Sequence, residues 1–181
     1  MTAIDFSAFV DELATVSGET ILPFFRTALS IEDKGRRGSF DPVTAADHAA
    51  ETAMRTLIRR TFPDHGIIGE EYGKERADAE YVWVLDPIDG TKSFISGLPT
   101  WGTLIGLMHR GRPVYGMMAQ PFTRERFIGD GKRARLRTLA PSRGDAPHMW
   151  VEVDRTAPNL VLYPPVAGNG KNGRQHVVVS D

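Results

Sequence analysis

The apolar residues of the first part of the chain recur at two different spacings, which predict helices first and strands afterwards. Between residues 5 and 28, apolar side chains return every three or four positions, as on one face of a helix, and Pro23 should bend or interrupt that helix. A second helical pattern begins near Thr44 and ends at Phe62. Thr44 followed three residues later by Asp47 resembles a capping box, which supports a helix start at this point.

Shorter apolar runs with turn residues between them follow the second helix. They predict strands at residues 66–69, 81–85, 100–108, 113–120 and from 127 onward. Residues 30–42, with two glycines and a proline, predict a mobile loop or a loose hairpin. Helices followed by strands favour an α+β fold, in which helices are layered on a largely antiparallel or mixed sheet.

Composition and charge exclude several classes of protein. The 181 residues are 41% apolar with a net charge of −1, which excludes a disordered chain and disfavours a basic nucleic-acid binder. The chain has no Cys, so a disulfide-stapled secreted protein is excluded. No apolar run is long enough to cross a membrane, and the N-terminus lacks the pattern of a signal peptide. We therefore expect a cytoplasmic protein without nucleic-acid or membrane partners.

The composition changes near Gly131. All nine Phe lie before position 128, and the acidic residues outnumber the basic ones up to residue 131, whereas the reverse holds from 132 to 181. The last segment also holds five Pro and the run Gly-Asn-Gly-Lys-Asn-Gly. Such a segment has little to bury and many breakers of regular structure. We interpret 1–131 as a folded domain and 132–181 as a divergent, disordered tail; the alternative is an ordinary, loop-rich second half.

Four acidic residues stand where predicted elements begin or end: Asp47, Glu70, Asp86 and Asp89. The last two flank a proline after a buried strand and precede Gly90, a residue type that allows a ligand to approach the backbone. Oxygen ligands without Cys or His suit Mg²⁺ rather than zinc. Carboxylates beside exposed amides are what a metal-assisted phosphate site requires. A single Asp of this kind would be interpreted as a surface charge, but the combination predicts a site.

These residues fall in motifs that resemble the inositol monophosphatase-type, Mg²⁺-dependent phosphatases. Three blocks match in order: Asp-Pro-Val-Thr-Ala-Ala-Asp at 41–47, Gly-Glu-Glu at 69–71 and Trp-Val-Leu-Asp-Pro-Ile-Asp-Gly-Thr at 83–91. The resemblance covers roughly residues 5–131. Residues 92–103, Lys-Ser-Phe-Ile-Ser-Gly-Leu-Pro-Thr-Trp-Gly-Thr, are most similar to the histidinol-phosphatase branch.

The resemblance implies a role for each matched residue. Glu70, Asp86 and the carbonyl of Ile88 would hold a first Mg²⁺, and Asp86 and Asp89 a second. Asp47 and Thr91 would position and deprotonate the attacking water, with assistance from Glu70. The implied substrate-binding residues are Glu70, Ile88, Asp89, Gly90 and Thr91, with the backbone N–H groups of the last two on the phosphate. The implied fold is the N-terminal α+β domain of a layered α/β sandwich, of the inositol monophosphatase and fructose-1,6-bisphosphatase type.

The resemblance is incomplete in the last fifty residues. Members of the family carry a Trp-Asp-type motif in their second half, whose Asp completes the second metal site. Here Trp150 is followed by Val151, and no Asp after Gly131 follows a Trp. We expect a weakened second metal site and an exposed apolar surface or sheet edge. Our hypothesis is a truncated or frame-shifted member read out of frame from 132, which the other two reading frames of the coding DNA would test.

The leading functional prediction is Mg²⁺-dependent hydrolysis of a small phosphorylated metabolite, with L-histidinol phosphate, a compound of histidine biosynthesis, as the best match. Inositol-1-phosphate is the alternative substrate, and sugar or nucleotide bisphosphates stay open. The alternative of another class is an inactive fragment with residual metal binding. The resemblance also makes a homodimer a possible assembly.

Overall fold

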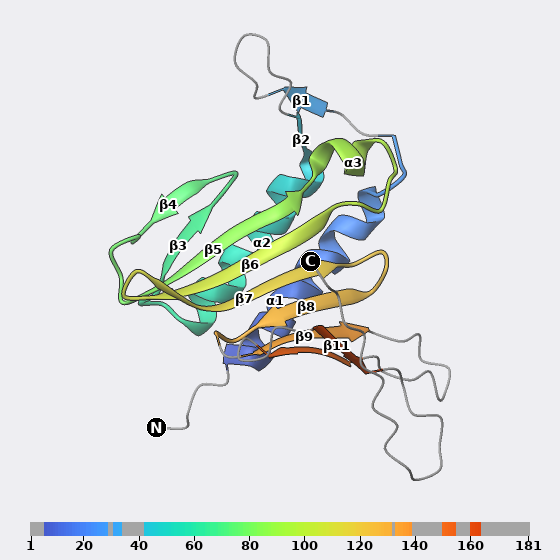
Figure 1. Cartoon of the computed structure of the whole chain (residues 1–181). Coiled ribbons are helices and arrows are strands. Elements are labelled where there is room, and N and C mark those ends of the chain that lie inside the picture. Colours follow the sequence, from blue (N-terminus) through green and yellow to red (C-terminus); the bar gives the residue numbers. More distant parts are fainter. Residues whose placement is uncertain are drawn as a thin grey trace.

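Two long helices, α1 and α2, lie on one face of a nine-stranded sheet (Figure 1). The structure, a computed structural model, describes residues 6–28, 31–33, 42–131, 133–138, 150–154 and 160–163. The strands follow the order β11-β10-β9-β8-β7-β6-β5-β3-β4, and every neighbouring pair is antiparallel except β3 and β5. The fold is therefore of the predicted α+β type, with a mixed sheet.

The strands of this sheet are β3 (Gly66–Gly69), β4 (Gly73–Glu75), β5 (Tyr81–Asp89), β6 (Gly102–His109), β7 (Arg112–Gln120), β8 (Glu125–Gly129), β9 (Arg133–Thr138), β10 (Trp150–Asp154) and β11 (Leu160–Tyr163). The strands predicted at 66–69, 100–108, 113–120 and from 127 correspond to β3, β6, β7 and β8. A hairpin joins β6 and β7, as the turn between them predicted. These matches confirm the predicted strands, whereas β4 was not predicted from the sequence.

The first helix, α1 (Phe6–Ile21), ends where the sequence predicted a break. It gives way to the short 3₁₀ helix η1 (Leu22–Phe24), which carries Pro23. Proline has no N–H to donate and clashes with the preceding turn, so a regular helix does not continue through it. The buried side of α1 includes Phe9, Val10 and Leu13, which pack toward the sheet.

The second helix, α2 (Ala45–Thr61), begins with the predicted capping box. The Thr44 hydroxyl accepts from the N–H of Ala46, and Asp47 accepts from the N–H of Thr44. These bonds satisfy N–H groups that have no partner inside a helix. The helix therefore starts at one fixed residue, which places Asp47 in its first turn.

The strand β5 is longer than predicted. Pro87 was expected to stop it, but the strand continues to Asp89, with an irregular register against β6 between Asp86 and Asp89. A bulge tolerates a residue without an N–H, because the ladder is interrupted there anyway. The carbonyl of Pro87 accepts a hydrogen bond of 2.8 Å from the hydroxyl of Thr103 on β6, which holds the irregular segment against its neighbour.

Ahead of α2, β1 (Ile31–Asp33) pairs with β2 (Pro42–Thr44) in an antiparallel ladder. Of the two alternatives for residues 30–42, this pairing supports the hairpin. Residues 34–41, which hold the loop between the strands and Asp41, the first residue of the 41–47 block, lie outside the described part of the chain.

The sheet continues past residue 131, which corrects one prediction. The sequence predicted a disordered tail from residue 132, but β9 pairs with β8, and β10 and β11 extend the same sheet. In this arginine-rich segment, arginines alternate with the apolar Ala134 and Leu136, so the apolar side chains share one face of the strand. Leu136 on that face is buried. The remaining residues after Thr138 lie outside the described ranges, so the domain boundary itself stays a prediction.

Two apolar clusters lie between the helices and the sheet. The larger one joins α1 and α2 to the sheet through side chains that include Phe9, Met54 and Trp83. The smaller one lies near the end of β5 and includes Ile21, Ala50, Ile88, Phe94 and Trp101. The second cluster buries Ile88, two residues before Gly90, and Phe94, four residues after it, so it anchors the segment in which the acidic motif lies.

The face of the sheet opposite the helices exposes large apolar side chains. Val84, Met118 and Phe127 are 38%, 39% and 42% exposed, whereas their neighbours Trp83, Leu85 and Met117 are buried under the helices. Met118 and Phe127 are direct partners across β7 and β8. This agrees with the predicted exposed apolar surface. Among the described residues, no helix is long and apolar enough to cross a membrane.

Candidate active site

Parallel pairing of β3 and β5 brings two of the predicted acidic residues together. Gly69 pairs with Leu85, so Glu70 and Asp86 follow at the same edge of the sheet. The N–H of Glu70 donates to the carbonyl of Leu85 at 3.1 Å. The two carboxyl groups are close enough for the charge of Glu70 to act on Asp86.

Asp86 is the most perturbed acid of this cluster. Burial, followed by the charge of Glu70, raises the pKa of Asp86 from 3.8 to about 8, and the charges of Asp89 and Asp47 add to the effect. Its Oδ1 is buried and has no hydrogen-bond partner among the described residues. A buried carboxylate oxygen without a partner, surrounded by other carboxylates, is a position that a cation would stabilise.

Asp47 is 1% exposed and lies near the same cluster. Its Oδ2 accepts from the N–H of Thr44 at 2.9 Å and from the Thr44 hydroxyl at 2.6 Å. Burial raises the pKa of Asp47, against the opposing effect of the Thr44 hydrogen bonds, and the charge of Glu70 raises it further. The charge of Asp47 in turn acts on Asp86, so the capping residue of α2 is electrostatically part of the site.

The turn after β5 has a backbone that only glycine adopts easily. Gly90 has a φ of +89°, and a Cβ added to it would lie 3.0 Å from the carbonyl oxygen of Thr100. The short helix α3 (Thr91–Ile95) begins directly afterwards, so the first N–H groups of the turn have no partner within the helix. The hydroxyl of Thr91 donates to the carbonyl of Ile88 at 3.0 Å.

The motif residues line one open pocket of about 220 Å³. Its lining consists of Glu70, Asp86, Ile88, Asp89, Gly90, Thr91 and Lys92. All the predicted site residues except Asp47 are in this set. The resemblance had paired Asp47 with Thr91 at the attacking water, but no hydrogen bond joins these two residues within the described part of the chain, since each uses its side chain on a nearer partner.

The residues of the pocket fit a divalent cation in part. In the described ranges, no three Asp, Glu, His or Cys side chains already surround a common metal position. The fit rests instead on Glu70 and Asp86 lining the same pocket at one sheet edge and on the Asp86 Oδ1 without a described partner. The carbonyl of Ile88 has a second lone pair beside the one that Thr91 uses, so it can still act as a ligand.

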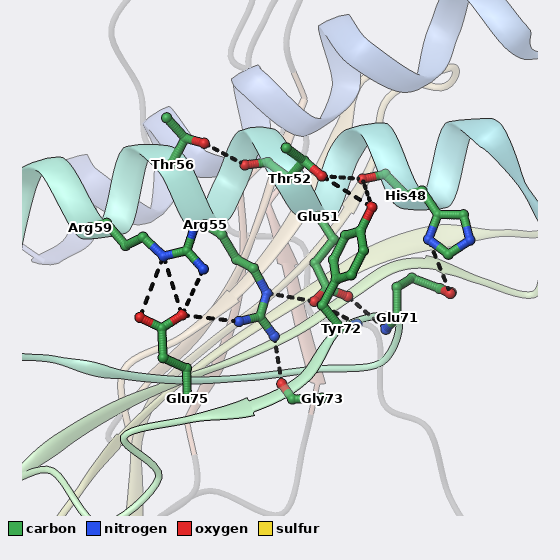
Figure 2. Close-up of polar contacts among 10 residues, drawn as sticks. All are labelled: His48, Glu51, Thr52, Arg55, Thr56, Arg59, Glu71, Tyr72, Gly73 and Glu75. Atoms are coloured by element: carbon green, nitrogen blue, oxygen red, sulfur yellow. Dashed lines mark hydrogen bonds and ion pairs between the residues drawn. The ribbon is translucent and has the colours of Figure 1, made fainter.

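Sequence reasoning missed the polar contacts behind Glu70. Glu51 and Arg55, on α2, are 0% and 4% exposed, and their side chains contact the segment that follows Glu70 (Figure 2). A signal was available in the sequence, because Glu51 and Arg55 are four positions apart on the predicted helix that carries Asp47 in its first turn. Lys92, the cation among the described residues of the pocket lining, entered the sequence analysis only as the first residue of the 92–103 block, without a role of its own.

The fold and the pocket together define a class of protein. It is an α+β protein with a carboxylate cluster at one edge of a mixed sheet, next to backbone N–H groups that have no partner within their helix, as in metal-dependent phosphoryl chemistry. Residues 5–156 match the Inositol monophosphatase family, and the chain belongs to this family. The match extends beyond residue 131, where the sequence alone predicted that the resemblance would end.

Individual relatives agree with this assignment. The chain is 50% identical over 135 residues to the bifunctional phosphatase IMPL2, chloroplastic, of Arabidopsis thaliana, covering 72% of this chain and 38% of that protein. It is 41% identical over 86 residues to a histidinol-phosphatase of Mycobacterium tuberculosis, covering 48% and 33%. The structure matches an inositol monophosphatase of Zymomonas mobilis with a TM-score of 0.60 and 38% identity, covering 80% and 56%. The chain thus spans between a third and three fifths of the length of these relatives.

Proposed function

We propose that this chain carries the acidic half of a Mg²⁺-dependent phosphatase site and that it acts on a small phosphate monoester. The observation that carries this proposal is the placement of Glu70 and Asp86 side by side at one sheet edge, in the pocket that the motif lines, with a buried oxygen on Asp86 that has no partner among the described residues. Membership in the family supports the same class of reaction.

The charge of the pocket explains why a cation is needed. Among the described residues, its lining holds three carboxylates, those of Glu70, Asp86 and Asp89, and one ammonium group, that of Lys92. This lining repels a phosphate dianion, because like charges in a partly buried site interact strongly. Glu70, Asp86 and the Ile88 carbonyl would hold one Mg²⁺, and Asp86 and Asp89 a second. When bound, Mg²⁺ supplies positive charge for the phosphoryl oxygens and lowers the pKa of water.

The other residues of the site would bind, orient and move a proton. The backbone N–H groups of Gly90 and Thr91 would hold phosphate oxygens, since the turn leaves them without a helical partner. Asp47, with its raised pKa, would accept the proton of the attacking water. Thr91, already fixed by its bond to Ile88, would orient that water. The displacement at phosphorus would be direct and in line, without a covalent intermediate.

We infer L-histidinol phosphate as the substrate, with inositol-1-phosphate as the alternative. The similarity to a histidinol-phosphatase and the residues 92–103 support the first. The similarity to an inositol monophosphatase structure supports the second. The candidate of another class, an inactive chain that only binds metal, is favoured by one observation: Trp150 is followed by Val151, so the Trp-Asp motif has no match.

Phosphate release from both substrates tests these alternatives. The purified chain is assayed with each substrate in Mg²⁺ and in EDTA, and folding is checked by circular dichroism. We expect release that requires Mg²⁺ and is faster with L-histidinol phosphate. Faster release from inositol-1-phosphate would reverse the substrate assignment, and no release from a folded preparation would favour the inactive alternative.

The resemblance also leads us to propose a homodimer in the cytoplasm without nucleic-acid or membrane partners. Light scattering coupled to size exclusion tests the assembly: a mass near 20.0 kDa would mean a monomer and contradict the homodimer.

A further inference from the structure

A row of polar side chains on α2 contacts residues 71–75, the segment that follows Glu70 (Figure 2). This row lies on one face of the helix, because its members are three or four positions apart: His48, Glu51, Thr52, Arg55 and Arg59. Its contacts reach from Glu71 to Glu75, the last residue of β4. The helix that positions Asp47 thus also holds the backbone next to Glu70.

Glu51 is the centre of these contacts and is fully buried. Its Oε2 accepts from the N–H of Glu71 at 2.7 Å, and its Oε1 accepts from the N–H of Tyr72 at 3.2 Å and from Nε of Arg55 at 2.7 Å. Both carboxylate oxygens are therefore directed at the turn that starts with Glu70. Charge-assisted bonds of this kind are shorter and stronger than neutral ones.

Arg55 adds contacts to β4, the strand that follows the turn. Its guanidinium donates to the carbonyl of Gly73 and lies 3.4 Å from Glu75, while it also binds Glu51 (Figure 2). Glu75 is shared with the more exposed Arg59 at 2.7 Å. The network has a buried end at Glu51 and a more exposed end at the half-buried Glu75 and the exposed Arg59. It therefore contains two carboxylates that differ in burial and in distance from Glu70.

The backbone on both sides of Glu70 is fixed by this arrangement. Its own N–H is bound to Leu85, directly before Asp86, and the next N–H is bound to Glu51. At Gly69 an added Cβ would lie only 1.9 Å from Oε1 of Glu51, so the carboxylate occupies the space that any side chain would need. Glycine at 69 thus admits Glu51, and Glu51 sets the course of the turn.

We propose that Glu51, supported by Arg55, is a positioning residue that fixes the Glu70 carboxylate opposite Asp86 and so sets the affinity of the site for Mg²⁺. The inference rests on the proposed function, since it assigns a role in the same site. A buried ion pair alone adds little stability compared with apolar side chains of the same size. Here two hydrogen bonds from the backbone of the turn beside a predicted metal ligand end on one buried carboxylate, which Arg55 supports with a third. Residues behind a metal site orient its ligands through contacts of this kind.

Direct Mg²⁺ binding, measured by isothermal titration calorimetry on the full chain, tests this role. Glu51→Gln keeps the size of the side chain but replaces one accepting oxygen with an NH₂ group that cannot accept. We expect its Kd for Mg²⁺ to rise by roughly 10–100-fold, the effect typical of residues that orient metal ligands. Glu75→Gln is the matched control, because it breaks the same network at its exposed end, and its Kd should stay within about twofold of the unsubstituted chain.

Thermal unfolding of both variants in EDTA separates positioning from folding. A purely structural role would lower the melting temperature of Glu51→Gln and leave the Kd of the folded fraction unchanged, which would overturn the inference. If Glu51→Gln does not fold, Arg55→Lys replaces it, because lysine keeps the charge but cannot make all three of the arginine contacts. An unchanged Kd in folded Arg55→Lys would overturn the inference equally. Absence of Mg²⁺ binding by the unsubstituted chain would instead refute the proposed function.

Discussion

Replacing Asp86 by asparagine should stabilise the metal-free protein at alkaline pH, although it removes a predicted metal ligand. The folded pKa of Asp86, about 8, lies above the value of 3.8 for an exposed carboxyl group. The folded state therefore retains a proton that the unfolded chain loses, and stability falls as the pH rises from about 4 toward 8. Asparagine has the same shape and no charge, so it abolishes this dependence.

The size of the effect follows from the pKa difference. Each pKa unit corresponds to ~1.4 kcal/mol, so the full difference would set an upper bound of roughly 6 kcal/mol. Asp86 is partly exposed, and solvent screening reduces such an effect, so we expect about 2 kcal/mol at pH 8. At pH 4 the unsubstituted protein and the variant should be almost equally stable.

Urea unfolding in EDTA, followed by circular dichroism at pH 4, 6 and 8, measures these differences. The expected result is a gap between Asp86→Asn and the unsubstituted protein that opens as the pH rises. Excess Mg²⁺ should stabilise the unsubstituted protein at pH 8 and the variant much less. A variant that is less stable than the unsubstituted protein at pH 8 without metal would refute the reasoning about Asp86.

Three further predictions concern the surroundings of the site. Thr44→Ala removes the cap of α2 and should lower the free energy of unfolding by ~1–2 kcal/mol, measured by urea unfolding. Gly90→Ala places a Cβ at a positive φ and close to a carbonyl oxygen, so it should lower the free energy of unfolding by ~2 kcal/mol or more. Gly111→Ala, with a similar φ of +74° and no described atom within 4 Å, should lower it by only about 1 kcal/mol in the same assay. The double variant Met118→Lys and Phe127→Lys places charges on the exposed sheet face and should reduce concentration-dependent scattering, and unchanged scattering would mean that this face does not associate.

The sequence predicted those parts of the fold whose signals are local. The capping box at Thr44 and the break at Pro23 depend on neighbouring residues, and both appear where expected. The motif residues from Glu70 to Thr91 line one pocket because parallel strands deliver their ends to the same edge. Periodicity and resemblance were sufficient for these features.

Features that depend on distant partners could not be predicted. The continuation of β5 through Pro87 needs the Thr103 hydroxyl of another strand to hold the irregular segment. The strand β9 forms in an arginine-rich segment because the edge of β8 is available for pairing. The contacts of Glu51 join residues twenty positions apart, so a charged residue in a helix gave no sign that it would be fully buried.

The central claim, that Glu70 and Asp86 hold the catalytic cation, is tested most directly by an anomalous difference map from crystals of this chain soaked in Mn²⁺, which substitutes for Mg²⁺ and scatters anomalously. The account predicts a peak in contact with the Glu70 and Asp86 carboxylates and the Ile88 carbonyl, and its loss in Asp86→Asn crystals. Crystals that diffract well and take up Mn²⁺ elsewhere, with no peak between Glu70 and Asp86, would contradict it.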